Sequence, residues 1–266
     1  MGPPAFLIGC HRAGTTLARF LLDAHPNIAC PPESKFIAAL HAFYEYPQAL
    51  AALESLGCPK SWVRAELRRF AEMVLGGYAR AQGKTRWVDK TPNYYRILPF
   101  IDEMFEGEAR YLFISRHPLD CASSLSAMYD GREELNDPEI ARSVALRGKG
   151  PLAWCRYWDE VYSALLAFRG DCAERCLVFR YEDLALDTEI TLTAILAFLG
   201  EQMTGNLVSI AMTMPHGAGY EDAGIRETGR VLRDRIGRWR SWRPGDVDAC
   251  WSEVRHTACL LGYEIT

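Results

Sequence analysis

The sequence lacks the features that mark secreted, zinc-binding or membrane-spanning proteins. None of its nine cysteines forms a Cys-x-x-Cys pair, so neither a zinc site nor a disulfide framework is indicated. No basic leader precedes an apolar segment, no Asn-x-Ser/Thr site occurs, and no apolar run approaches the roughly 18 residues of a membrane helix. We therefore expect a cytoplasmic chain with reduced thiols, no membrane partner and no metal.

An excess of one charge is missing too. The chain carries 30 lysine and arginine residues against 34 aspartate and glutamate residues, a net charge of −4, and this balance predicts no nucleic-acid partner. Hydrophobic residues make up 49% of the 266, which is enough for one sizeable α/β domain or two small ones. We expect a single domain over residues 1–266 and see no internal repeat, and the sequence favours no particular oligomeric state.

The most informative stretch lies near the N-terminus. An apolar run, Phe6-Leu7-Ile8, leads through Gly9-Cys10-His11-Arg12-Ala13-Gly14 into a segment of helical period that begins Thr15-Thr16-Leu17. A strand, a glycine-containing loop and a helix N-terminus together form a cradle for phosphate. The glycine spacing is that of a P-loop, but Thr15 stands where a nucleotidase carries lysine. The nearby cation is Arg12, which keeps the cradle and argues against ordinary ATP or GTP hydrolysis.

Apolar runs then alternate with helical segments along the chain. Further strands are expected at residues 86–90, 110–115 and 176–179, and further helices at residues 35–56, 61–82, 94–105, 118–128, 154–168, 190–199 and 247–261. This alternation predicts a P-loop-like three-layer α/β domain with a central, mainly parallel sheet flanked by helices, and ligands at the C-terminal ends of the strands. Residues 130–150 hold nine charges and three glycines and are expected to form a mobile loop.

A second basic motif follows the strand at 110–115. Arg116 ends that strand, and Ser124 lies about two turns along the next helix, on the face that can point back toward the sheet edge. An arginine fork suits a phosphate group, and a hydroxyl supplies one more donor. From spacing alone, a surface arginine beside a core helix explains the pattern equally well.

Four motifs in order resemble one enzyme family. They are Arg12-x-Gly14-Thr15-Thr16 after a strand, then Lys90-Thr91-Pro92, then Arg116 with Ser124, then Tyr181-Glu182-Asp183-Leu184. The set is similar to the sulfotransferases that use 3′-phosphoadenosine 5′-phosphosulfate (PAPS). The stretch from Leu22-Asp23-Ala24-His25-Pro26 to Pro32-Glu33 is most similar to the protein-tyrosine sulfotransferase branch and its bacterial relatives.

The resemblance implies a function and a set of donor-binding residues. The enzyme would move the sulfuryl group of PAPS, without a metal, to a hydroxyl of a small metabolite, glycan or peptide tyrosine by in-line displacement, leaving adenosine 3′,5′-bisphosphate (PAP). The loop from His11 to Thr16 would hold the 5′-phosphosulfate, Arg116 and Ser124 the 3′-phosphate, and Tyr181 the adenine side. Residues 216–243 would cover the nucleotide, with contacts from Arg233, Arg235 and Gly237.

The same resemblance implies three catalytic residues. Lys90 and Arg12 would stabilise the leaving group, and Glu33 would act as the base, with His11 and His41 as alternatives. Cytosolic members of the family place a histidine two residues after this lysine, where this chain has Pro92. Aromatic residues of the segments after Glu33 and within 130–158 could line an acceptor site or belong to the core; they are Phe36, Phe43, Tyr44, Tyr94, Tyr95, Trp154 and Trp158.

Two other functions remain open on the sequence. A P-loop kinase or nucleotidase would require magnesium-dependent ATP turnover, and the sequence offers no clear magnesium-binding aspartate after an apolar strand. A nucleotide-binding module without catalysis would bind PAP tightly and transfer nothing.

Overall fold

A five-stranded parallel sheet in the order β2-β3-β1-β4-β5 organises the molecule. The computed structural model describes residues 2–215, 231 and 233–265. The strands are β1 (Ala5–Ile8), β2 (Ile28–Ala29), β3 (Arg86–Lys90), β4 (Arg110–Ser115) and β5 (Cys176–Arg180). In the centre of the sheet, Leu7 of β1 pairs with Lys90 of β3 and Leu112 of β4. The predicted α/β class is therefore confirmed.

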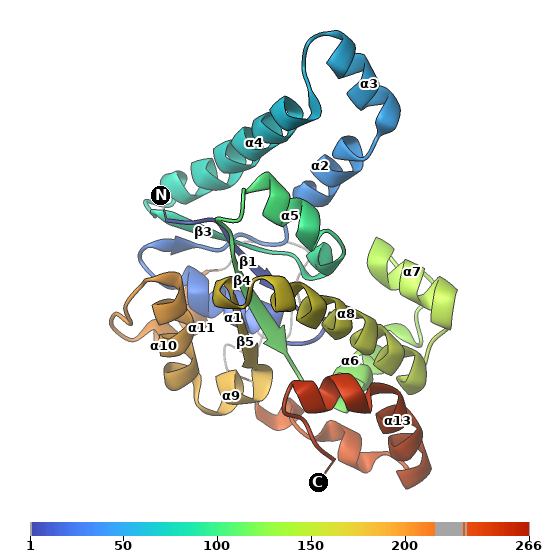
Figure 1. The fold of residues 1–266 in the computed structure, drawn as a ribbon. Coiled ribbons are helices and arrows are strands. Elements are labelled where there is room, and N and C mark those ends of the chain that lie inside the picture. The colour runs from blue at the N-terminus through green and yellow to red at the C-terminus, as the bar shows by residue number, and fades with distance from the viewer. Residues whose placement is uncertain (1, 216–230, 232, 266) are drawn as a thin grey trace.

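Helices cover both faces of this sheet, as its all-parallel strands require (Figure 1). Alternate residues of one strand enter two different cores: Phe6 and Ile8 face one, Ala5 and Leu7 the other. The first core is closed mainly by α4 (Lys60–Ala81), α5 (Leu98–Met104), α6 (Pro118–Tyr129), α8 (Pro151–Asp171) and α13 (Pro244–Leu260). The second is closed by α1 (Thr15–Asp23), α9 (Tyr181–Leu186), α10 (Thr188–Leu199) and α11 (Leu207–Thr213).

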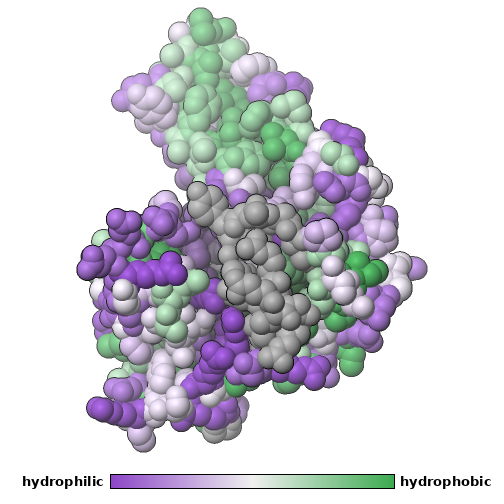
Figure 2. All heavy atoms as spheres, turned by 180° about the vertical axis from the view of Figure 1, so that it is seen from behind, coloured by the Kyte–Doolittle hydropathy of each residue, from purple (hydrophilic) through white to green (hydrophobic). Residues whose placement is uncertain are grey.

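Three helices form an arm that projects from the body (Figure 1). They are α2 (Phe36–Tyr44), α3 (Pro47–Ser55) and α4, so the single helix expected over residues 35–56 is in fact two. The break has a local cause, because a proline disfavours helical backbone at the residue before it, and Tyr46 is extended at φ −91° and ψ 100°. The arm carries exposed apolar side chains, among them Trp62, Phe70 and Met73. Figure 2 shows that apolar residues gather on the projecting part of the molecule.

The segment expected to be a mobile loop contains a helix, α7 (Pro138–Arg147). Asp137 caps it, because its carboxylate accepts hydrogen bonds from the backbone N–H groups of Glu139 and Ile140 at 2.9 and 3.2 Å. Pro138 opens the first turn, and the fully buried Ile140 anchors the helix to the core. The expectation of a loop over 130–150 was wrong for residues 138–147, since high charge density hid a capped amphipathic helix.

The remaining elements are short. A 3₁₀ turn, η1 (Pro92–Arg96), precedes α5, so the helix expected from 94 to 105 is divided. Others are η2 (Ala173–Arg175), η3 (Arg233–Arg235) and η4 (Arg238–Ser241). Most of the segment 216–243 that was expected to cover the nucleotide lies outside the described residues, apart from Val231 and residues 233–243.

Candidate active site

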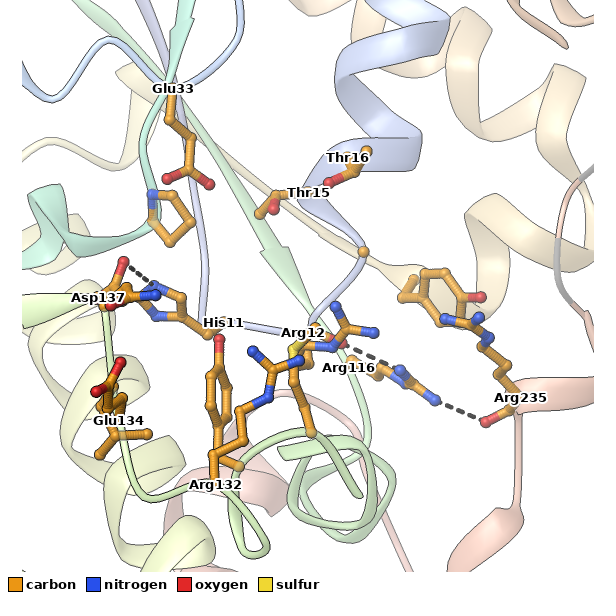
Figure 3. A pocket seen from close by; sticks show the side chains of 17 residues that line it. His11, Arg12, Thr15, Thr16, Glu33, Arg116, Arg132, Glu134, Asp137 and Arg235 are labelled. Carbon is orange, nitrogen blue, oxygen red and sulfur yellow. Dashed lines mark hydrogen bonds and ion pairs between the residues drawn. The ribbon is translucent and has the colours of Figure 1, made fainter. Parts of the chain in front are cut away.

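A pocket of about 380 Å³ opens where β1, β3 and β4 end (Figure 3). Its walls come from the loop after β1, the segments that follow β2 and β3, and the segment between α6 and α7. The lining residues are His11, Arg12, Gly14, Thr15, Thr16, Glu33, Pro92, Arg116, Met128, Tyr129, Arg132, Glu134, Leu135, Asn136, Asp137, Tyr181 and Arg235. The pocket thus lies at the C-terminal ends of parallel strands, where the sequence predicts the ligand site.

The loop between β1 and α1 has the geometry of an anion cradle. Gly14 adopts φ +97°, and α1 begins at the next residue, so the unpaired N–H groups of its first turn open beside the loop. A Cβ atom at Gly14 would lie 2.3 Å from a ring carbon of Tyr181, so only glycine fits there. Arg12 also has a positive φ of +70°, uncommon for a residue with a side chain and frequent at functional sites.

Arg116 links three parts of the site. It directly follows β4, is 4% exposed, and donates hydrogen bonds to the backbone carbonyls of Arg12 at 3.0 Å and Arg235 at 2.6 Å. Its guanidinium carbon lies 4.8 Å from the ring centre of Tyr181. Within the described residues its buried Nε has no acceptor. A buried donor without a partner is costly, and a bound phosphate would satisfy it.

Ser124 belongs to a neighbouring cavity. Its hydroxyl accepts a hydrogen bond from Arg12 Nε at 3.1 Å, and it lines a space of about 550 Å³. Four arginines line both this space and the first pocket: Arg12, Arg116, Arg132 and Arg235. A fifth, Arg238, lines the second space and not the first. The structure thus brings Ser124 to the same basic wall as Arg12 and Arg116.

Glu33 and Lys90 meet on the opposite side of the pocket. Lys90 is fully buried at the end of β3, and its Nζ donates to Glu33 Oε1 at 3.0 Å. Only Glu33 of the two lines the pocket. Lys90 therefore lies behind Glu33 in this state, and its expected contact with the leaving group stays a prediction.

A chain of charges continues from Glu33 to His11. Lys35 Nζ lies 3.5 Å from Glu33 Oε2 and 2.9 Å from Asp137 Oδ2, and Asp137 Oδ2 lies 3.6 Å from His11 Nε2. The other nitrogen of His11 is 2.7 Å from the Tyr157 hydroxyl. Burial alone would raise the pKa of Asp137, but hydrogen bonds and charge from His11 and Lys35 hold it well below its usual range.

Asp89 holds the residue next to Glu33 in place. It is fully buried at the end of β3 and accepts a hydrogen bond of 2.7 Å from Ser34, the residue after Glu33. Burial raises the pKa of Asp89 from 3.8 to about 6, although hydrogen bonds from Ser34, Tyr94 and Thr91 oppose that rise. The carboxyl of Asp89 therefore fixes the backbone that carries Glu33.

Several predicted residues lie elsewhere. Arg233 Nε donates to the carbonyl of Ala185 at 2.9 Å, and the Gly237 N–H donates to Asp120 at 2.7 Å, so neither lines the pocket, whereas Arg235 does. Ala13 is buried under the loop, and His41 packs on Phe100. The aromatic residues proposed for an acceptor site do not line the pocket; Tyr44, Tyr94, Tyr95, Trp154 and Trp158 are buried in the core.

Sequence reasoning placed the region 130–158 at the acceptor pocket but named only its aromatic residues and missed the polar ones that line the pocket. Arg132, Glu134, Asn136 and Asp137 all line the pocket, and Lys35 joins Asp137 to Glu33. A signal was available in Asp137-Pro138-Glu139, the pattern of a helix start, which fixes where the preceding segment must end.

Across the described part of the chain, no three His, Cys, Asp or Glu side chains are grouped to hold a metal ion. No helix described is long and apolar enough to cross a membrane.

Comparison with known proteins identifies the family. The model of the sulfotransferase family matches residues 3–205, which is more than half of the chain. The chain belongs to the sulfotransferase family. Among curated relatives, this chain is 33% identical to the nodulation protein NoeE of Sinorhizobium fredii over 47% of its length, and 23% identical to the protein-tyrosine sulfotransferase of Drosophila melanogaster over 98% of it.

Solved structures agree on the fold. The sulfotransferase domain of the curacin biosynthetic pathway superposes with a TM-score of 0.70 at 20% identity, covering 100% of this chain and 99% of that domain. The sulfotransferase domain of the Synechococcus PCC 7002 olefin synthase gives 0.69 at 21% identity, covering 100% and 97%. By contrast, the chain spans only 31% of NoeE and 52% of the Drosophila enzyme.

Proposed function

We propose that this protein transfers the sulfuryl group of PAPS to a hydroxyl group. One observation carries the proposal: a basic wall containing Arg12, Arg116 and Arg235 faces, across one pocket, a glutamate that is hydrogen-bonded to a buried lysine. The basic wall suits a donor with several anionic groups, and the glutamate suits the removal of a proton from the acceptor.

The residues present fit PAPS. The N-terminus of α1 and the loop before it can accept the 5′-phosphosulfate, and Arg116 offers a buried N–H that has no partner among the described residues. Arg116 and Ser124 lie at one wall, so a second phosphate on the 3′ oxygen has donors as well. A mouse sulfotransferase of similar fold (TM-score 0.57, 17% identity) was solved in complex with PAP, which supports the same ligand here.

The reaction is an in-line displacement at sulfur. The acceptor oxygen forms a bond to sulfur while the bond to the bridging oxygen breaks, and that oxygen leaves with its electron pair on PAP. Glu33 accepts the proton of the acceptor hydroxyl, with Lys90 and Lys35 holding its two carboxylate oxygens in place. Arg12 and the N-terminus of α1 neutralise the charge that develops on the leaving oxygen. As in phosphoryl transfer, the protein contributes position and charge.

The acceptor is proposed to be a hydroxyl of a small metabolite, a glycan or a peptide tyrosine. The wall opposite the arginines is polar, with Glu33, Glu134, Asn136 and Asp137. One relative is a protein-tyrosine sulfotransferase, which supports a peptide tyrosine as one of these acceptors. No nucleic-acid or membrane partner forms part of the proposal.

Calorimetric titration of the full chain with PAP and with ATP, each with and without magnesium, tests the donor. We expect tight, magnesium-independent binding of PAP and weak binding of ATP. Transfer of labelled sulfate from PAPS to a panel of phenols, sugars and tyrosine peptides then tests the reaction. Binding of ATP only in the presence of magnesium would refute the proposal in favour of a kinase or nucleotidase. Tight PAP binding without transfer to any acceptor would favour a module without catalysis.

A further inference from the structure

The segment between α6 and α7 carries an arginine that the family motifs do not include. Arg132 lines both the pocket of about 380 Å³ and the neighbouring cavity of about 550 Å³. It shares that double position with Arg12, Arg116 and Arg235. In Figure 3 its guanidinium points into the pocket, toward Arg12 and away from Glu134. Arg132 thus lies at the wall that the two cavities have in common.

The guanidinium of Arg132 lacks the carboxylate partner that other arginines of the described residues have, such as Arg96 and Arg175. Arg96 is paired with Glu139, and Arg175 with Asp102. Among the described residues the guanidinium of Arg132 makes no ion pair, and its recorded contact is with the ring of Tyr129, 6.0 Å from the guanidinium carbon. An arginine directed at other arginines rather than at a carboxylate is repelled by them, and an anion bound between them would turn this repulsion into attraction.

The backbone that carries Arg132 is held in place. Its N–H donates to the carbonyl of Tyr129 at 3.1 Å, and its own carbonyl accepts a hydrogen bond from Lys149 Nζ. Two residues earlier, the carboxylate of Asp130 accepts from the Gly150 N–H at 3.2 Å and from Trp154 Nε1 at 2.8 Å. The segment is therefore tied to the start of α8, so these contacts set the backbone position of Arg132. Such preorganisation lowers the entropy cost of binding.

We infer that Arg132 is a donor-binding residue, which neutralises the anionic groups of the donor from the side opposite to Thr15 and Thr16. This inference rests on the proposed function, because it assumes a nucleotide with two anionic ends. It assigns the segment between α6 and α7 to the donor as well as to the acceptor. A charge-assisted contact of this kind changes affinity by about 10- to 100-fold.

The test is the affinity of the full chain for PAP, measured by calorimetry for Arg132→Ala, Arg132→Lys and two reference variants. Arg255→Ala is the matched control, because Arg255 is exposed on α13, away from the pocket. Arg116→Ala is the reference for the proposed donor site. We expect Arg132→Ala to weaken PAP about 10- to 100-fold, Arg132→Lys to lose less, and Arg255→Ala to match the unaltered chain. The loss should shrink at high salt.

The outcomes separate the inference from the function on which it rests. If the unaltered chain does not bind PAP, the proposed function fails and this assignment fails with it. If Arg116→Ala loses affinity while Arg132→Ala binds as the unaltered chain does, the donor site stands and Arg132 has no part in it. Unchanged melting temperatures for both Arg132 variants are expected, since the side chain is exposed; a loss of affinity that follows a loss of folding would count against the inference.

Discussion

Replacement of Arg116 by alanine gives the most direct test of how the donor is held. In the structure this side chain bonds to the carbonyls of Arg12 and Arg235, stacks on Tyr181, and keeps one buried N–H without an acceptor within the described residues. We predict that it contacts the 3′-phosphate. The variant therefore loses two effects at once: support of the loop, and a contact with one particular phosphate.

The two effects separate when two ligands are compared. PAP carries both phosphates, whereas adenosine 5′-phosphate lacks the one on the 3′ oxygen. Loss of loop support weakens both ligands equally, while loss of the charge-assisted contact weakens PAP alone by about 1.5–3 kcal/mol, or roughly 10- to 150-fold in Kd. The expected result of Arg116→Ala is thus a larger loss for PAP than for adenosine 5′-phosphate by that amount.

Calorimetric titration of both ligands against both proteins measures the difference. Arg116→Lys serves as the control for charge, because it keeps the cation and loses the planar fork, and its loss should be smaller. Equal losses for the two ligands would show that Arg116 acts only by supporting the loop. A larger loss for adenosine 5′-phosphate would place Arg116 at the 5′ end and refute the assignment.

Three further predictions concern Glu33 and two buried groups whose pKa values are shifted. Glu33→Gln should cut turnover by roughly 10²–10⁴ and leave PAP affinity almost intact, while Glu45→Gln, an exposed control on the arm, changes neither; full activity of Glu33→Gln would remove it as the base. Burial raises the pKa of Asp89 from 3.8 to about 6, so between these values the native form retains a proton that the unfolded chain has lost. The free energy of unfolding, measured with denaturant, should therefore fall by about 3 kcal/mol from pH 3.8 to 6 relative to Asp89→Asn. The same pH dependence in both proteins would contradict this. Burial lowers the pKa of His117 from 6.5 to about 4, so stability that is present above pH 6.5 should be lost on acidification to pH 4. The free energy of unfolding should fall by about 3 kcal/mol over this range relative to His117→Phe. An equal fall in that variant would refute the reasoning.

Local sequence patterns were enough to predict the sheet and its basic edge. The buried run of β1, the glycine at position 14 and the arginine that follows β4 are each encoded within a few residues, and parallel topology then brings these segments together. The family was recognised for the same reason, because its motifs are short and occur in order. That recognition is confirmed by the match over residues 3–205.

The rest of the site depends on packing between distant segments. Lys35 and Asp137 are 102 residues apart, and neither shows its partner in its own neighbourhood. Lys90 could have been a solvated strand end or a pocket residue; it is buried against Glu33, because the turn after β2 passes over the end of β3. Arg233 and Arg235 lie two residues apart in one 3₁₀ turn but have different partners: the Arg233 side chain bonds to Ala185, and the Arg235 carbonyl bonds to Arg116. A loose motif alignment does not distinguish the two.

Asp137 connects these separately encoded parts. One of its oxygens caps α7 and so fixes the end of the segment that carries Arg132; the other meets Lys35, which holds Glu33, and faces His11 of the phosphate loop. The loop after β1, Glu33 and the wall between α6 and α7 are therefore joined through a single carboxylate. Because Asp137 holds both this wall and Lys35, a shift of the wall should also disturb Glu33. We therefore predict that an acceptor binding against residues 134–137 must leave Glu33, the proposed base, aligned with the donor. On this proposal, selection of the acceptor and alignment of the base depend on the same contacts.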